Sequence, residues 1–284
     1  MTSATPDRPP LVISAQSQVV HGHVGNSAAI FPMQAAGLEV AAIPTVVFSN
    51  TPDYPTLRGA ALAPAMFADL LLGAEERALP QRASFLMTGY IGSVEVAALL
   101  VDFVTRCKRT NPDLVYVCDP VMGDHAPGLY VPKAIADIMR EGLLPLADLA
   151  TPNSFELTHL TGHPIATLAD LKAAAQTLRL APSARLIATG CILQDTPRNH
   201  LESVVLGPDS VSRHPTPHLP VALPGTGDLF AGLLVAGLGR GLATPQAVDQ
   251  AQALTGMALD HARMIGAREV VLFAPDFRRA LLQM

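Results

Sequence analysis

The feature that most constrains the fold is a repeated alternation of short apolar segments with longer segments of helical spacing. Val40–Phe48, Ala83–Met87 and Leu114–Cys118 are apolar and strand-like, and amphipathic segments such as Val94–Lys108 separate them. This alternation predicts a mostly parallel central sheet that helices cover on both faces. The expected fold is therefore α/β, a three-layer α/β/α sandwich.

The remaining expected elements extend this pattern along the chain. Further strands are expected at Leu11–Ala15, Leu146–Ala150, Arg185–Ala188 and Glu269–Phe273, with an antiparallel pair at Leu201–Leu206 and Val211–His214. Further helices are expected at Ser27–Ala36, Ala63–Leu72, Lys133–Gly142, Asn153–Leu160, Leu168–Leu180, Asp228–Leu238 and Thr244–Met264, with a last helix after Phe273. Because no linker or internal repeat interrupts this series, residues 11–284 are expected to form one domain after a disordered leader at residues 1–10.

Composition excludes several classes of protein. At 284 residues with 49% apolar residues, the chain can bury a large core, and its net charge of −5 argues against a nucleic-acid partner. The 3 cysteines are too widely separated for a disulfide framework or a CxxC metal site. We expect a cytoplasmic protein without a membrane partner, because no signal peptide is visible and the apolar run Leu229–Gly239 is too short to cross a bilayer.

The stretch Gly225-Thr226-Gly227-Asp228 is the first candidate for chemistry. Glycines let a backbone approach a ligand, and the free N–H groups of a helix start favour an anion. Asp228 follows where a base could meet a hydroxyl group beside that anion. The alternative is an ordinary glycine-rich turn with an aspartate at a helix start.

Other polar groups follow expected strands, where ligands of parallel sheets bind. Asp119 and Asp124 place two carboxylates after the strand that ends at Cys118, and Mg²⁺ prefers such ligands; an Asp-Pro turn is the structural alternative. Asn153 and Glu156 have the spacing of a helix capping box, a role compatible with one near a metal. Thr189-Gly190 is a weak signal on its own.

The absence of basic residues from these clusters limits the reactions that they could catalyse. Residues 17–26, 119–128, 151–156, 189–192 and 225–228 contain no Lys or Arg, and the chain has neither a P-loop nor a GxGxxG fingerprint. If phosphates bind here, metal ions and backbone N–H groups must balance their charge. Phosphoryl transfer depends on such positioning and neutralisation more than on a strong base.

Several stretches together carry a resemblance to a known family: Ser17–Ala29 with Phe31-Pro32, Thr45–Asn50, Thr88-Gly89-Tyr90, Cys118–Asp124, Thr151–Glu156 and Gly225–Asp228. On these residues the chain resembles the pyridoxal kinases of the ribokinase-like superfamily over nearly its whole length. The Gly-Thr-Gly-Asp motif is shared widely in that superfamily. The Gly-Asn-Ser-Ala-Ala and Phe-Ser-Asn motifs are specific to the pyridoxal branch.

This resemblance implies a ribokinase-like fold and ATP-dependent phosphorylation of the 5′-hydroxymethyl group of pyridoxal, and often of pyridoxine and pyridoxamine. It implies that Asp228 is the catalytic base and that the backbone of residues 225–227 (Gly225, Thr226, Gly227) forms the anion hole. The implied substrate contacts are Ser17, Val24, Phe48, Pro52, Asp53, Tyr90 and Asp228.

The same resemblance implies a nucleotide and metal side of the site. The implied ATP contacts are Asp119, Tyr130, Asn153, Glu156, Thr189, Gly190, Thr226 and Gly227. The implied groups near Mg²⁺, and near a monovalent cation (K⁺ or Na⁺) that Thr151 would help to hold, are Asp119, Asp124, Thr151 and Glu156. The family also implies a homodimer.

One departure from the family pattern concerns the substrate. After Phe-Ser-Asn the family usually has His-Thr, whereas this chain has Thr51-Pro52-Asp53. Pro52 offers neither a hydroxyl group nor an N–H donor. Loss of one neutral hydrogen bond is expected to weaken vitamer binding by about 0.5–1.5 kcal/mol.

Two other functions remain open at this stage. A hydroxymethylpyrimidine kinase, or another ribokinase-like small-molecule kinase, would use the same anion hole and Asp228. A vitamin B6 binding protein with weak catalysis is the alternative outside the kinases, although the intact Gly-Thr-Gly-Asp motif argues against it.

Overall fold

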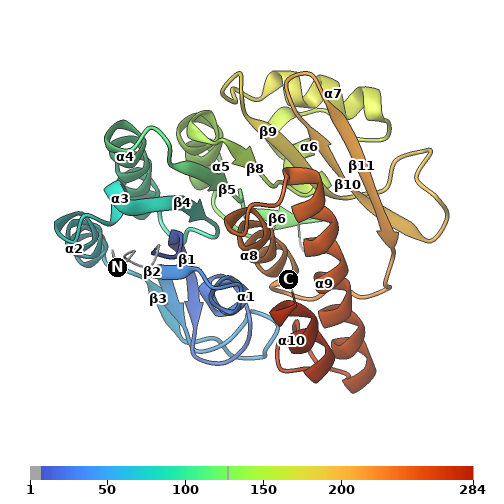
Figure 1. Ribbon diagram of the computed structural model, residues 1–284, viewed down its shortest axis with the longest axis horizontal. Helices are drawn as coiled ribbons and strands as arrows, with labels where there is room; N and C mark the ends of the chain where they lie inside the picture. Colours follow the sequence, from blue (N-terminus) through green and yellow to red (C-terminus); the bar gives the residue numbers. More distant parts are fainter. Residues whose placement is uncertain (1–7, 127, 284) are drawn as a thin grey trace, which may run out of the picture.

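A nine-stranded sheet forms the middle layer of the computed structural model, which describes residues 8–126 and 128–283 (Figure 1). The strand order is β11-β10-β9-β8-β5-β4-β1-β2-β3. The strands are β1 (Leu11–Val19), β2 (Glu39–Phe48), β3 (Gly59–Ala61), β4 (Ala83–Thr88), β5 (Val115–Cys118), β8 (Leu149–Ala150), β9 (Arg185–Cys191), β10 (His200–Leu206) and β11 (Val211–Pro217). A separate short hairpin consists of β6 (Gly123–Asp124) and β7 (Gly128–Leu129).

The centre of the sheet is parallel and its edges are antiparallel. Strands β2, β1, β4, β5, β8 and β9 pair in parallel, whereas β10, β11 and β3 run antiparallel to their neighbours. The predicted hairpin of β10 and β11 is confirmed, with its turn closed by a 2.9 Å hydrogen bond from Gly207 N–H to Ser210 O. The carboxyl ends of the parallel strands therefore meet at one edge of the sheet, where the polar clusters follow them.

Helices cover both faces of the sheet and complete the predicted three layers (Figure 1). One face carries α1 (Asn26–Ala35), α8 (Thr226–Gly239), α9 (Thr244–Ile265) and α10 (Pro275–Leu282). The other carries α2 (Pro64–Glu76), α4 (Val94–Thr110), α5 (Lys133–Ile138), α6 (Ser154–Thr161) and α7 (Leu168–Thr177), with α3 (Leu79–Arg82) leading into β4. The helix expected at Lys133–Gly142 is divided, because one turn of π-helix (Met139–Leu143) and a 3₁₀ turn (Leu144–Leu146) follow α5.

Helix α8 is buried along most of its length, which explains why its sequence is apolar on every side. It packs closely on α1, because an ideal Cβ on Gly232 would lie 2.7 Å from Cα and 2.8 Å from O of Ala29. Glycine at position 232 therefore lets the two helices approach, and their first turns lie side by side at the carboxyl edge of the sheet.

The strand expected at Glu269–Phe273 is wrong. Residues 267–274 form an irregular connector between α9 and α10, in which Val270, Val271 and Leu272 are buried. An apolar run indicates burial but does not by itself provide a neighbouring strand with free backbone groups. This run instead packs against the loops at the carboxyl edge of the sheet.

Two expectations concern the limits of the chain. Residues 1–7 of the expected leader lie outside the described residues, and the single domain at 11–284 stays a prediction. Across residues 8–126 and 128–283, no helix combines the length and apolar character needed to cross a bilayer.

Candidate active site

The first turn of α8 presents free backbone N–H groups. Gly225 precedes the helix with φ of 85°, and an ideal Cβ there would lie 1.8 Å from the backbone oxygen of His23. Glycine is thus required both by conformation and by space. Among the described residues, no acceptor receives the N–H groups of Thr226, Gly227 or Asp228. Because the positive end of the helix dipole lies here, this turn is suited to bind an anion.

The first turn of α1 brings Ser17 beside this turn. Gly25 precedes α1 with φ of 53°, and an ideal Cβ there would lie 2.2 Å from Oγ of Ser17. The backbone N–H of Gly25 also interacts with the carboxylate of Asp228 and lowers its pKa. Ser17 and Asp228 therefore both lie close to the same glycine, although they are far apart in the sequence.

Two buried carboxyl groups face each other across this site. Burial raises the pKa of Asp228, and the N–H of Gly25 offsets only part of that effect. Burial, followed by the charge of Asp228, raises the pKa of Asp119 to about 8, while a 3.0 Å hydrogen bond donated by Thr151 lowers it. Asp119 Oδ2 and Asp228 Oδ1 have no hydrogen-bond partner among the described residues. Both oxygens are therefore available to a ligand.

Glu156 has a structural role and also borders the site. The predicted capping box is confirmed, because Glu156 accepts the N–H of Asn153 at 2.9 Å and Asn153 accepts the N–H of Glu156 at 2.8 Å. Glu156 also accepts the N–H of Met122 at 3.0 Å. Burial and then the charge of Asp119 raise its pKa, so Glu156 lies close to the carboxyl pair.

The predicted metal residues are not arranged as a preformed cage. Within the described ranges, no cluster of three or more His, Cys, Asp or Glu side chains is placed to enclose a metal ion. Asp124 is exposed and accepts the N–H of His125 at 2.6 Å, whereas Asp119 is buried with a free oxygen. Such a donor set fits Mg²⁺, which usually takes one or two carboxylates and completes its shell with water and phosphate oxygens.

Two tyrosines, Tyr90 and Tyr130, lie close to each other in this region. The rings of Tyr90 and Tyr130 are 6.4 Å apart, and Tyr130 follows the β6–β7 hairpin with its N–H bonded to Met122 O at 3.0 Å. Burial raises the pKa of Tyr130, and the negative charges of four carboxylates add to this: Glu156, Asp228, Asp119 and Asp124. The hairpin therefore places Tyr130 near these four carboxylates.

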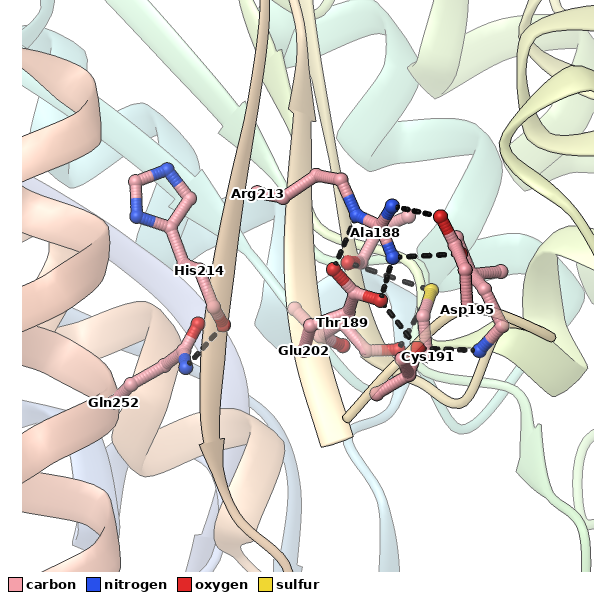
Figure 2. A network of polar contacts seen from close by, with 10 residues as sticks. Ala188, Thr189, Cys191, Asp195, Glu202, Arg213, His214 and Gln252 are labelled. Carbon is pink, nitrogen blue, oxygen red and sulfur yellow. Dashed lines mark hydrogen bonds and ion pairs between the residues drawn. The ribbon is translucent and has the colours of Figure 1, made fainter. Parts of the chain in front are cut away.

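Thr189 and Gly190 lie at the end of β9, where an ion network fixes the following loop (Figure 2). Arg213 donates to Glu202 at 2.7 and 2.6 Å and to Asp195 at 2.6 and 2.9 Å. Figure 2 shows the guanidinium of Arg213 between these two carboxylates. The network ties the segment after Gly190 to β10 and β11.

The loop after β2 is less closely connected to these groups. Phe48 and Val24 are half-buried, whereas Pro52 and Asp53 are exposed. No hydrogen bond among the described residues joins Pro52 or Asp53 to Ser17 or Asp228. The structure thus brings most of the predicted residues together but leaves these two at the rim.

Gly25 and Glu269 also belong to this region, although neither was predicted from the sequence as a site residue. Gly25 could have been recognised as the residue that precedes a helix after a strand, as Gly225 does. Glu269 could have been noticed as a carboxylate inside an apolar run.

The site combines free amide donors, a buried carboxylate beside them and further carboxylates without cationic partners. Among the described residues, no ion pair includes Asp119, Asp124, Glu156 or Asp228. This arrangement suits the transfer of a phosphoryl group to an alcohol, with the amides stabilising negative charge and a carboxylate accepting the proton.

Comparisons with known proteins agree with this chemistry. A family model described as phosphomethylpyrimidine kinase matches residues 81–272. The chain is 38% identical over 280 residues to the pyridoxal kinase PdxY of Deinococcus radiodurans, covering 96% of this chain and 94% of the relative. It is 37% identical to the pyridoxine/pyridoxal/pyridoxamine kinase of Bordetella avium over 267 residues, covering 93% and 90% of the two chains. Its structure is similar to the pyridoxal kinase from Leishmania donovani in complex with ADP and ginkgotoxin, with a TM-score of 0.87, 30% identity and coverage of 97% and 96%.

Proposed function

This chain belongs to the phosphomethylpyrimidine kinase family, within its pyridoxal kinases, and on that premise we propose that it phosphorylates the 5′-hydroxymethyl group of pyridoxal with ATP. Pyridoxal 5′-phosphate is the product, and pyridoxine and pyridoxamine are further substrates. The observation that carries the proposal is the convergence of Ser17, Gly25 and Asp228 beside the free amides of α8. An alcohol bound beside these residues would lie between a base and an anion site.

Asp228 accepts the proton of the substrate hydroxyl as the new bond to phosphorus forms. Its raised pKa makes it a stronger base than an exposed aspartate. The N–H groups of Thr226 and Gly227, with Gly225 holding the turn open, stabilise the negative charge of the transferred phosphoryl group. Removing Asp228 should therefore affect the chemical step more than binding.

The substrate half of the site is formed by the loops after β1 and β2. Ser17 lies beside Gly25 and binds the pyridine ring through its hydroxyl group. Val24 and Phe48 pack on the ring faces, and Tyr90 lies next to it. Pro52 and Asp53 form the rim of the pocket, where the chain lacks the family's usual threonine.

The nucleotide half is formed by the ends of β5, β8 and β9. The groups proposed to bind ATP are Asp119, Tyr130, Asn153, Glu156, Thr189, Gly190, Thr226 and Gly227. Asp119 offers its free oxygen toward Mg²⁺, Asp124 and Glu156 lie nearby, and Thr151 contributes to a monovalent cation site. Bound Mg²⁺ would supply the positive charge that the phosphates need, since residues 119–128, 151–156, 189–192 and 225–228 contain no Lys or Arg.

The experiment that tests this function is a substrate panel with ATP and Mg²⁺. Phosphate transfer to pyridoxal, pyridoxine, pyridoxamine and hydroxymethylpyrimidine is followed by separating the products. We expect pyridoxal to have the highest kcat/KM. Phosphorylation of hydroxymethylpyrimidine but not of pyridoxal would instead support the second candidate function, a hydroxymethylpyrimidine kinase. The observation that favours this second candidate is the matching family model, which is described as phosphomethylpyrimidine kinase. Pyridoxal binding without turnover would indicate a binding protein.

We further propose that the enzyme is a cytoplasmic homodimer. The three cysteines Cys107, Cys118 and Cys191 are buried free thiols, which suits a reducing compartment. Val20 is 84% exposed and Val47 is 41% exposed near the carboxyl ends of β1 and β2, which supports an apolar contact with a second subunit there. Light scattering on the purified protein measures the subunit number directly.

A further inference from the structure

The irregular connector between α9 and α10 reaches the two loops proposed to hold the substrate. These are the 20–25 loop, which follows β1, and the 49–54 loop, which follows β2. An ideal Cβ on Gly22 would lie 2.2 Å from Oε2 of Glu269 and 2.7 Å from Cγ2 of Thr51. Glu269 and Thr51 thus both lie against the backbone of Gly22, so the connector joins the two loops at this point.

Arg268, next to Glu269, makes a second contact with the 49–54 loop. Its Nη1 donates to the backbone oxygen of Asp53 at 3.4 Å, and its guanidinium lies 6.0 Å from the ring centroid of Tyr54. The Tyr54 hydroxyl is in turn 3.1 Å from Nε2 of His21 in the 20–25 loop. Both residues of the connector therefore contact the same pair of loops.

Packing alone does not explain a glutamate at position 269. The residue is only 8% exposed, and its Oε2 has no hydrogen-bond partner among the described residues. Its ion pair within those residues is with His23, whose Nδ1 lies 3.9 Å from Oε1. A buried carboxylate with an unpartnered oxygen lowers stability relative to an apolar side chain of similar size. The presence of a glutamate at this buried position therefore needs a reason other than stability.

The same connector also contacts the anion turn. An ideal Cβ on Gly225 would lie 1.8 Å from the backbone oxygen of His23 and 3.3 Å from Cγ2 of Val270. His23 therefore lies with its ring near Glu269 and its backbone against Gly225. Because Gly25 follows two residues later and contacts Ser17, a shift of His23 would be transmitted to the substrate half of the site.

We propose that Arg268 and Glu269 are positioning residues that hold the 20–25 and 49–54 loops together in the substrate-binding arrangement. Glu269 acts through His23 and Gly22, and Arg268 acts through Asp53 and Tyr54. This inference rests on the proposed function, because it assigns the two loops to the vitamer. Among the described residues, no hydrogen bond or ion pair joins Arg268 or Glu269 to the ends of β5, β8 and β9, where the rest of the nucleotide half lies.

The test compares KM values for pyridoxal and for ATP in single variants. Glu269→Gln keeps the size of the side chain and removes its charge, and we expect KM for pyridoxal to rise about 3- to 10-fold. Arg268→Ala is expected to raise it about 2- to 5-fold. In both variants kcat and KM for ATP are expected to stay within about twofold of wild type.

Two control variants separate positioning from stability. Glu202→Gln removes the charge of another buried glutamate, which pairs with Arg213 at the other end of the sheet. It should lower the melting temperature without changing KM for pyridoxal. Arg263→Ala removes an exposed arginine whose one ion pair among the described residues is with Asp260 of its own helix, and it should change neither quantity.

A double-variant cycle tests the route through His23. If Glu269 acts through that ring, the double variant with His23→Gln and Glu269→Gln should have nearly the same KM for pyridoxal as either single variant. Additive effects would contradict this route.

The proposal is overturned if Glu269→Gln and Arg268→Ala both leave KM for the alcohol substrate unchanged. If Glu269→Gln fails to fold, Arg268→Ala and His23→Gln decide by the same criterion. If wild type phosphorylates hydroxymethylpyrimidine and not pyridoxal, the proposed function is wrong, and the same KM ratios measured with that substrate still decide the role of the pair. If wild type phosphorylates neither, both proposals are wrong.

Discussion

The close contact of α1 and α8 gives the sharpest test of how the active site is built. Alanine at position 232 would place its Cβ 2.7, 2.8 and 2.9 Å from Cα, O and Cβ of Ala29. Two of these atoms are backbone atoms, so no side-chain rotation relieves the overlap. Gly232→Ala must therefore push the two helices apart, and overpacking of this kind typically costs about 1–3 kcal/mol.

Gly256→Ala is the matched control, because Gly256 lies inside α9 and an ideal Cβ there meets nothing within 4 Å. Each substitution gains about 0.5–1 kcal/mol of helix propensity. That gain cancels when the two variants are compared, so their difference isolates the overlap of α1 and α8. We expect Gly256→Ala to unfold at higher urea concentration than wild type and Gly232→Ala at lower concentration, with a difference in unfolding free energy of about 1–3 kcal/mol.

Urea titrations followed by far-ultraviolet circular dichroism, together with kcat, measure both consequences. Because α1 begins at the glycine beside Ser17 and α8 carries Asp228, separating the helices also misaligns the base, and kcat of Gly232→Ala should fall while that of Gly256→Ala does not. Equal stability of the two variants would refute the close approach. Lower stability with unchanged kcat would refute its link to catalysis.

Three further outcomes are expected. Asp228→Asn should lower kcat for pyridoxal by about 10²–10⁴-fold while calorimetry shows unchanged ADP binding, and full activity in this variant would remove Asp228 from the mechanism. Pro52→Thr should restore a hydrogen bond to the vitamer and lower KM by about 2- to 12-fold, so an unchanged KM for every vitamer would contradict the assigned rim position. The pKa of Asp119, raised to about 8 by burial and Asp228, means that the folded metal-free protein favours the protonated form. Its contribution to stability is therefore fully present below the ordinary pKa of 3.8 and is lost progressively as the pH rises from there to about 8. Asp119→Asn should flatten the pH dependence of the melting temperature in chelator and should be more stable than wild type above that pH; parallel curves would count against the buried pair.

The sequence predicted the parts of the site that depend on local pattern. Asp119 and Thr151 follow apolar segments that became parallel strands, and parallel strands necessarily end at one edge of the sheet. The capping box of Asn153 and Glu156 was predictable because both hydrogen bonds lie within a single helical turn.

The sequence did not predict features that depend on long-range partners. Strand β1 continues through Gln16 and Gln18 to Val19, beyond its expected end at Ala15, because β2 pairs with it as far as Val19 and Phe48. The side chain of Gln18 also donates to Ser27 of α1 at 2.7 Å. Without those partners, polar residues normally mark the end of a buried strand.

The prediction of a strand at Glu269–Phe273 was wrong for a related reason. The apolar pattern of this segment predicted that its residues would be buried, and most of them are buried in the structure. Whether a buried extended segment becomes a strand depends on a neighbour with free backbone groups, which lies far away in the sequence. The same segment instead packs against Gly22 and Gly225, two glycines that leave room for it because they lack a Cβ.

The charge of Asp228 shows how burial and helix dipole compete in this site. A helix start favours the anionic carboxylate, typically by 0.3–1 kcal/mol and up to about 2 kcal/mol when partly buried. The dipole of α8 and the N–H of Gly25 would therefore make Asp228 a weak base. Burial acts in the opposite direction and is the larger effect, because the pKa of Asp228 is raised overall. The free amides of the same turn then remain for the incoming anion rather than for Asp228. A base and an anion site thus share one helix start without neutralising each other, which is the condition that phosphoryl transfer to an alcohol requires.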